Sequence, residues 1–134
     1  MYPTPIDALL FDKDGTLFAF DATWARVMEA ALDHLARDRA MRARLAVAAG
    51  YDMAAGRFLP GAPIVAGTGG EVAELWGRER PDLGMDGVLA EMERLASETL
   101  AAEGPVPAVP DLGALMDELG AMGYALGIAT HDSE

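Results

Sequence analysis

Residues 9–18 read Leu-Leu-Phe-Asp-Lys-Asp-Gly-Thr-Leu-Phe, and this stretch decides which fold we expect. The apolar run before Asp12 is continuous and too short for a typical helix, which is typical of a β-strand covered on both faces. Gly15 then permits a sharp turn out of the strand. Because side chains on a strand alternate between its faces, we expect Asp12 and Asp14 to reach one pocket and Lys13 to point away from it.

Two carboxylates at one point offer three kinds of chemistry. They can bind a hard cation through oxygen, attack phosphorus covalently, and carry the proton of a leaving group. The alternative is an Asp-Gly turn with acidic neighbours, because short motifs also occur by chance. Asp12 and Asp14 are therefore candidate catalytic residues.

The rest of the chain is predicted to be mainly helical, with one further strand. Apolar residues recur three or four positions apart in several segments, whereas two segments rich in Gly and Pro are expected to be loops or connectors. The expected helices lie at 21–35, from 37 to near 50, and at 68–76, 86–100 and 111–122, the irregular segments at 56–70 and 103–110, and the second strand at 124–129.

This order of elements predicts a parallel αβ arrangement interrupted by a long helical insertion. Residues 1–17 and 106–134 are expected to form a partial α/β core, and residues 18–105 the insertion. Asp12 and Thr130 would both follow the carboxyl ends of parallel strands, which is where open α/β sheets bind their ligands.

Two segments of the chain resemble motifs of the haloacid dehalogenase (HAD) superfamily of phosphohydrolases. Residues 12–17 match its first motif, a hydrophobic strand followed by Asp-x-Asp-x-Thr. Residues 127–134, Gly-Ile-Ala-Thr-His-Asp-Ser-Glu, are similar to its second motif, a strand that ends in a Thr or Ser whose hydroxyl binds the phosphoryl group. Thr130 stands at that position.

Residues 51–58 and 66–68 look like the helical cap of the phosphoglycolate phosphatase-like branch of this superfamily. The resemblance implies a HAD-type, Rossmann-like parallel core containing the first two core strands, with an inserted all-helical cap. It also implies an Mg²⁺-dependent phosphatase that acts on a small phosphorylated metabolite.

The resemblance assigns roles to individual residues. Asp12 would attack phosphorus to form an aspartyl phosphate, and Asp14 would act as the acid and base. Both would help to bind Mg²⁺. Asp14 favours phosphate esters over halides, because dehalogenases of the superfamily lack this second acid. The phosphate-binding residues would be Gly15 and Thr16 through their backbone, Thr130 through its hydroxyl, and His131, although a histidine in such a loop can equally be structural.

The third and fourth motifs of the superfamily, which supply a lysine and further metal-binding acids, are not found within the 134 residues, and the single lysine is Lys13. We therefore expect a chain cut after the second motif, with impaired activity. The alternative is a non-catalytic HAD fragment that binds phosphate or a protein partner. A core of two strands would have two bare edges, so a homo-oligomer or a segment-exchanged dimer is expected.

Composition narrows the class of protein further. The 134 residues are 51% hydrophobic and carry a net charge of −12, so a globular chain is expected and nucleic-acid binding is not. The chain has no cysteine, so neither a disulfide nor a thiolate site is possible. With neither a signal peptide nor a long apolar run, we expect a cytoplasmic protein without a membrane segment.

Overall fold

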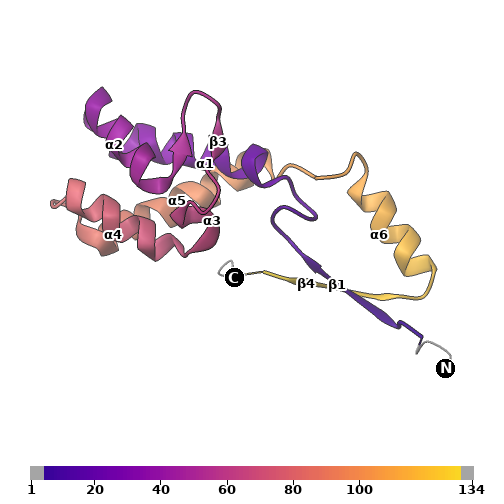
Figure 1. Ribbon diagram of the computed structural model, residues 1–134. Helices are drawn as coiled ribbons and strands as arrows, with labels where there is room; N and C mark the ends of the chain where they lie inside the picture. Colours follow the sequence, from indigo (N-terminus) through magenta and orange to yellow (C-terminus); the bar gives the residue numbers. More distant parts are fainter. Residues whose placement is uncertain (1–4, 131–134) are drawn as a thin grey trace. The chain divides into compact units, whose positions relative to one another are not determined.

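The computed structural model describes residues 5–130, which fall into two compact units (Figure 1). The first unit, called here the core unit, contains residues 1–20 and 105–134, and the second, the helical unit, contains residues 21–104. The chain therefore leaves the core unit once and returns to it once.

The core unit contains a parallel two-stranded sheet. Strands β1 (Ala8–Asp12) and β4 (Ala125–Ala129) pair in a register that runs from Ala8 opposite Ala125 to Asp12 opposite Ala129. The two strands and their parallel direction are as predicted. Each strand begins one or two residues after the start of the apolar run that predicted it, and β1 also includes Asp12.

Helix α6 (Leu112–Ala121) precedes β4 and packs against it. The Asp111 carboxylate accepts a hydrogen bond from the N–H of Ala114 at 2.9 Å, which caps the start of the helix. Gly123 has φ of +93°, the left-handed conformation that glycine adopts without strain, and it turns the chain into β4.

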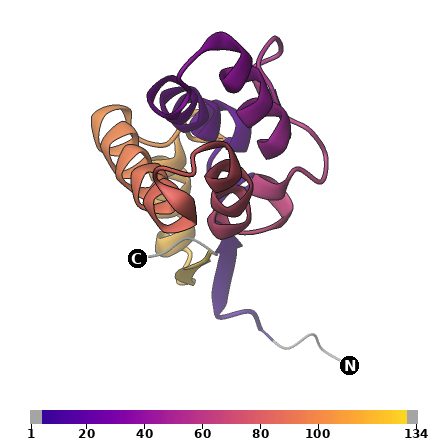
Figure 2. The same cartoon turned by 90° about the vertical axis from the view of Figure 1, so that its left-hand side faces the viewer.

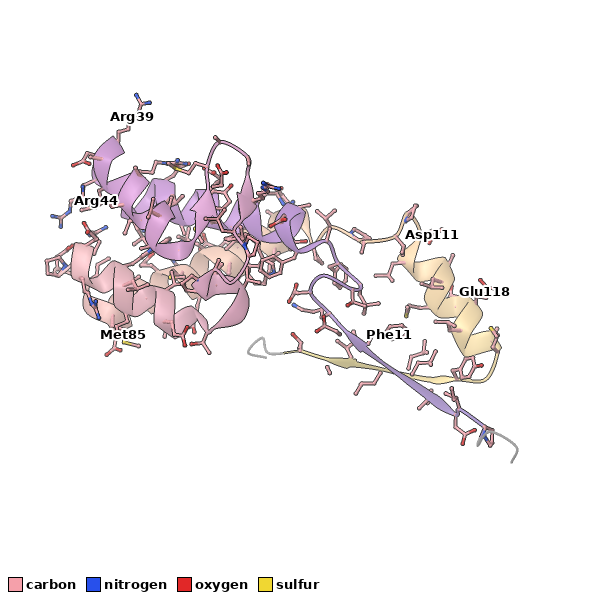
Figure 3. The ribbon with its side chains drawn as sticks, in the orientation of Figure 1. Phe11, Arg39, Arg44, Met85, Asp111 and Glu118 are labelled. Atoms are coloured by element: carbon pink, nitrogen blue, oxygen red, sulfur yellow. The ribbon has the colours of Figure 1, made fainter. Side chains whose placement is uncertain are left out.

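The two faces of this sheet differ in the size of their side chains. Paired residues of parallel strands point to the same face, so Phe11 shares a face with Ile128. Phe11 is drawn on the side of the sheet that faces α6 (Figure 3). On the other face Leu10 lies over Gly127, and its side chain is 73% exposed. The described part of the core unit therefore leaves apolar residues of the sheet open to solvent.

The helical unit consists of helices gathered around a common centre (Figure 2) and a short antiparallel hairpin. The residues buried in its interior are mainly apolar. Trp76 is fully buried there, and its indole N–H donates to the carbonyl of Leu45 at 2.9 Å. The elements are α1 (Phe20–Leu35), α2 (Arg39–Ala49), β2 (Tyr51–Asp52), β3 (Arg57–Phe58), α3 (Pro63–Ala66), α4 (Gly69–Glu79) and α5 (Gly84–Glu103).

Several local details of the helical unit differ from the sequence prediction. The sequence Thr68-Gly69-Gly70-Glu71 predicts a capping box at the start of a helix. Thr68 precedes α4 as expected, but its side chain makes no capping hydrogen bond. The sequence predicts Asp86 as the cap of the helix at 86–100, but α5 begins at Gly84, so Asp86 lies in its first turn. The segment 56–70 was expected to be irregular but contains β3 and α3, because pairing with β2 and the proline at the start of α3 order parts of it.

No helix within residues 5–130 is both long enough and apolar enough to cross a membrane.

Candidate active site

The candidate site lies where β1 and β4 end. Asp12 is the last residue of β1 and pairs in register with Ala129, the last residue of β4. Thr130 follows Ala129 directly, so Asp12 and Thr130 stand at the carboxyl ends of neighbouring parallel strands. This is the edge at which open α/β sheets bind ligands.

A compact turn follows Asp12. The carbonyl of Lys13 accepts hydrogen bonds from the N–H groups of Leu17 at 2.9 Å and Phe18 at 3.1 Å. Gly15 has φ of +81°, and its N–H donates to the carbonyl of Phe18 at 2.8 Å. Gly15 is required here because residues with a side chain rarely adopt this conformation. The turn holds Asp14 close behind the end of β1.

Thr16 contacts the first aspartate through its side chain. Its hydroxyl donates to Oδ2 of Asp12 at 3.2 Å. The sequence motif indicated only a backbone role for Thr16, so this contact is an addition from the structure. A hydroxyl four residues after an aspartate, across a glycine turn, is the signal that could have revealed it. The bond orients a carboxylate that is otherwise exposed.

The expectation that Lys13 points away from the acidic pair is wrong for Asp14. The Lys13 ammonium lies 3.3 Å from Oδ2 of Asp14, and the two side chains are only 24% and 19% exposed. The alternation of side chains holds only within a strand, and β1 ends at Asp12. Lys13 therefore belongs to the turn. Within residues 5–20 and 105–130 it is the only lysine or arginine.

The N–H groups of Gly15 and Thr16, predicted to bind phosphate, both donate to backbone carbonyls, but with hydrogen bonds of different length. The N–H of Gly15 makes the short bond to Phe18 described above. The N–H of Thr16 donates to the carbonyl of Lys13 at 3.4 Å, which is a long and weak hydrogen bond. The Thr16 N–H is thus the easier of the two to redirect toward a ligand. His131, also predicted to bind phosphate, lies outside the described residues.

The acidic residues fit a magnesium ion that shares its coordination with a ligand. Within residues 5–130 no group of three or more acidic or histidine side chains is arranged to hold a metal. Asp12 and Asp14 are two hard oxygen donors. Mg²⁺ is usually held by one or two carboxylates together with water and substrate phosphate, and Asp12 and Asp14 supply donors of this type.

Backbone hydrogen bonds join the residues that follow the turn to the segment that precedes α6. The N–H of Ala19 donates to the carbonyl of Val106 at 2.8 Å, and the N–H of Ala108 donates to the carbonyl of Leu17 at 2.9 Å. These two bonds fix residues 17–19 beside residues 106–108. The turn that carries Asp14 is therefore anchored on the side away from β1.

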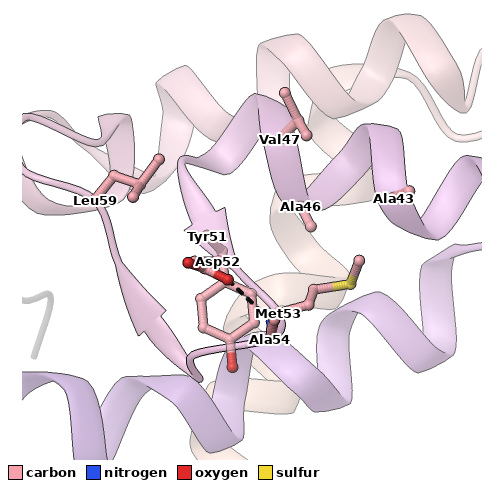
Figure 4. Close-up of a pocket in the computed structure, with 8 residues that line it drawn as sticks. All are labelled: Ala43, Ala46, Val47, Tyr51, Asp52, Met53, Ala54 and Leu59. Carbon is pink, nitrogen blue, oxygen red and sulfur yellow. Dashed lines mark hydrogen bonds between the residues drawn. The ribbon is translucent and has the colours of Figure 1, made fainter.

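The helical unit has a shallow pocket of about 410 Å³ beside α2 and the β2–β3 hairpin (Figure 4). Val47, Met53 and Leu59 make much of its lining apolar. Its acidic residue, Asp52, accepts hydrogen bonds from the N–H groups of Ala54 and Ala55, each at 3.0 Å. Because this carboxylate already stabilises the hairpin turn, the pocket lacks a reactive group comparable with those beside β1.

The arginines of residues 37–44 form a cluster that either a phosphate-binding patch or, more commonly, a solvated helix face would explain. Three of them pair with acids in the structure. Arg42 binds Glu29 and Asp33, and Arg44 binds Glu79. Arg37 pairs with Asp82 at 2.9 Å. These contacts stabilise the helical unit and favour the alternative of a solvated helix face.

An aspartate at the end of a parallel strand, a second aspartate in the turn that follows it, and a threonine directly after the neighbouring strand are residue types that hydrolases use. The model of the family described as haloacid dehalogenase-like hydrolase matches residues 6–134, and the chain belongs to this family. The superfamily that the two motifs indicated is thereby confirmed. No curated protein and no solved structure matches the chain significantly.

Proposed function

We propose that this hydrolase cleaves small phosphate monoesters, similar to the substrate of phosphoglycolate phosphatases, through an aspartyl phosphate formed on Asp12. The observation that supports the proposal is the register of the sheet. Asp12 closes β1 opposite Ala129, so that Thr130 and the turn carrying Asp14 lie at the same edge. A nucleophile, an acid and a hydroxyl donor would then be available to one substrate.

The first half of the reaction transfers the phosphoryl group to the protein. A carboxylate oxygen of Asp12 attacks phosphorus, and the bond from phosphorus to the ester oxygen breaks. The electron pair goes to the leaving oxygen, which takes the proton of the Asp14 carboxyl group. The products are a free alcohol and the phosphorylated Asp12.

The second half releases phosphate. The Asp14 carboxylate, having lost its proton, accepts a proton from water while the water oxygen attacks phosphorus. The bond between phosphorus and the Asp12 oxygen breaks, which regenerates both carboxyl groups in their starting states. One residue thus serves as acid in the first step and base in the second.

Charge on the transferring group requires donors and cations close by. The Thr130 hydroxyl, the N–H groups of Gly15 and Thr16, and His131 are the proposed phosphoryl contacts. Asp12 and Asp14 would hold Mg²⁺, which supplies Lewis-acid stabilisation of the phosphoryl oxygens when bound. Lys13 is a further cation next to this site and adds to the residues that the sequence motifs indicated.

The test is turnover of a generic aryl phosphate with Mg²⁺ by the full chain and by three matched variants. Asp12→Asn is expected to abolish turnover. Asp14→Asn is expected to lower it by about 10²- to 10⁴-fold, the usual contribution of a general acid or base. Asp7→Asn makes the same chemical change in an exposed residue just before β1 and should leave the rate unchanged. Equal rates in all four proteins would contradict the proposal.

A second candidate function is phosphate binding without turnover. The observation that favours it is the ion pair of Lys13 with Asp14, because the only lysine or arginine within residues 5–20 and 105–130 already compensates an acid. Calorimetric titration with inorganic phosphate separates the two candidates. Binding that is lost in Thr130→Val, in a chain without turnover that depends on Asp12, would support the non-catalytic function.

A further inference from the structure

We propose that one face of the helical unit, formed by α2 and the β2–β3 hairpin, binds an acidic peptide segment of a partner protein that also carries apolar side chains. We call it the α2 face. Its residues all lie within the helical unit, so the binding would be independent of the chemistry of Asp12. The shallow pocket of about 410 Å³ lies on this face, and two arginines without acidic partners stand beside it.

Large apolar side chains are concentrated around this pocket. Within residues 21–104 the large apolar side chains that the structure exposes are those of Val47, Met53, Leu59, Val65 and Met85. The first three line the pocket, and Val47 is 78% exposed. Figure 4 shows the Met53 side chain extending along α2 toward Ala43. Apolar side chains gathered in one exposed patch indicate a binding surface, whereas isolated ones need no explanation.

The two arginines beside the pocket are Arg39 and Arg57, and neither forms an ion pair in the part of the chain that the structure describes. Every other lysine or arginine within residues 5–130 lies at 3.3 Å or less from an acidic oxygen. Both arginines are exposed, and Arg39 extends from the start of α2 away from other side chains (Figure 3). Because the chain has 22 acidic and 10 basic residues, two cations without acids beside them are an unexpected feature.

Both arginines lie on the same side of their elements as residues that line the pocket. Arg39, Ala43 and Val47 are four residues apart in α2, so they share one face of the helix. Arg57 pairs in register with Asp52, so these two side chains share a face of the hairpin. The Asp52 carboxylate accepts backbone hydrogen bonds of its own turn and forms no ion pair with Arg57. The pocket therefore has one cation on its α2 side and another on its hairpin side.

The dimensions of the α2 face suit a peptide better than a small molecule. Arg39 and Val47 are eight residues apart, which is about 12 Å along a helix, and Arg57 lies on a different element. A shallow pocket covers little of a small ligand, whereas a peptide segment can place apolar side chains in the pocket and carboxylates beside it. Arginine and methionine are both enriched in protein interfaces. The chain has a net charge of −12, so its other surfaces would repel an acidic segment.

A phage library of random peptides of about twelve residues, which span about 18 Å as a helix, is the probe. It is selected on the full chain, and a synthetic copy of the most enriched peptide is labelled for fluorescence anisotropy. We expect the enriched peptides to combine aspartate or glutamate with large apolar residues. Kd should rise several-fold between about 50 and 500 mM salt, because salt screens exposed charges. No enrichment, or enriched peptides without acidic residues, would overturn the proposal.

Substitutions in the pocket test where the peptide binds. Val47→Asp should raise Kd at least about tenfold, because it replaces apolar surface with a charge that repels the acids of the peptide. Val65→Asp is the matched control, since it makes the same change in an exposed residue of α3 that does not line the pocket. Circular dichroism verifies that both variants are folded. Equal Kd values for the two variants would overturn the proposal.

Substitutions of the arginines test the charge separately from the apolar contact. Arg39→Gln and Arg57→Gln should each raise Kd about two- to fivefold, the usual effect of one exposed ion pair. Arg78→Gln removes the same charge from α4, where Arg78 pairs with Glu74, and should leave Kd unchanged. An equal effect of all three substitutions would show that net charge alone matters and would overturn the proposed contacts.

Sedimentation velocity of the chain without peptide tests a different occupant of the α2 face. We expect Val47→Asp to leave the sedimentation of the chain unchanged at every concentration. Self-association that this substitution abolishes would assign the face to a second copy of the chain, and it would overturn the proposal of an acidic partner.

Discussion

The ammonium of Lys13 lies 3.3 Å from a carboxylate oxygen of Asp14, although the two residues are adjacent in the chain. This contact places a positive charge beside the pair of acids, and it exists because the strand ends one residue before Lys13. Removing the charge while keeping the length of the side chain should therefore weaken binding of a phosphate ester.

Lys13→Met is the variant that removes this charge. We expect KM for an aryl phosphate, or Kd for inorganic phosphate if there is no turnover, to rise about tenfold, which corresponds to roughly 1.4 kcal/mol and is typical of one charged hydrogen bond. Lys13→Arg retains the charge and should restore most of the affinity. Steady-state kinetics or calorimetry measures the change, and unchanged affinity in Lys13→Met would rule out a binding role.

The hydrogen bond from the Thr16 hydroxyl to Asp12 predicts a second effect on the site. Thr16→Val keeps the shape of the side chain but removes the donor, whereas Thr16→Ser keeps the donor. Loss of one hydrogen bond to a charged group costs about 1.5–3 kcal/mol, and the exposed setting places this bond at the low end, so roughly a tenfold lower kcat is expected for the valine variant. A serine variant as slow as the valine variant would contradict this role.

Replacing Trp76 should lower the stability of the helical unit. Trp76→Phe leaves the Leu45 carbonyl without its buried donor and opens space in a fully buried position. We expect the free energy of unfolding to fall by about 2–4 kcal/mol from these two effects together. Chemical denaturation followed by far-UV circular dichroism measures it. Trp24→Phe, at a partly buried position of α1, is the comparison and should cost less.

Stability at low pH should depend on Asp82. The guanidinium of Arg80 hydrogen-bonds to the Asp82 carboxylate and holds its pKa well below the ordinary value of 3.8. Because the folded-state pKa is depressed, the ionised form stabilises the fold above about pH 4, and this contribution fades as the pH falls further. Arg80 also donates to the carbonyl of Leu35 at 2.5 Å, so the pair joins two helices through one side chain.

Asp82→Asn should therefore lower Tm relative to the parent chain at pH 7, and the two melting temperatures should converge as the pH is lowered through 3. Asp117→Asn changes an exposed carboxylate of α6 and controls for net charge. Thermal melts at a series of pH values provide the measurement. If the difference in Tm between the parent chain and Asp82→Asn instead grew as the pH fell, the predicted direction of the pH dependence would be wrong.

The strand, the glycine turn and the acidic pair could be predicted because each depends on local sequence. The apolar run before Asp12 and the left-handed Gly123 after α6 required no knowledge of distant residues. The Lys13 contact was missed because strand alternation was extended one residue too far. The prediction that Thr68 caps α4 was wrong, because a side chain that matches a capping motif in sequence need not form the capping hydrogen bond. The partners of Arg42 and Arg44 depend on tertiary packing, which local patterns do not specify.

The hydrogen bonds between residues 17–19 and 106–108 bear on whether the 21–104 segment can be replaced. They hold the residues that precede and follow the 21–104 segment side by side, so the two ends of this segment start from neighbouring positions. A different insert whose termini are equally close could replace it without rebuilding the strands that carry Asp12 and Thr130.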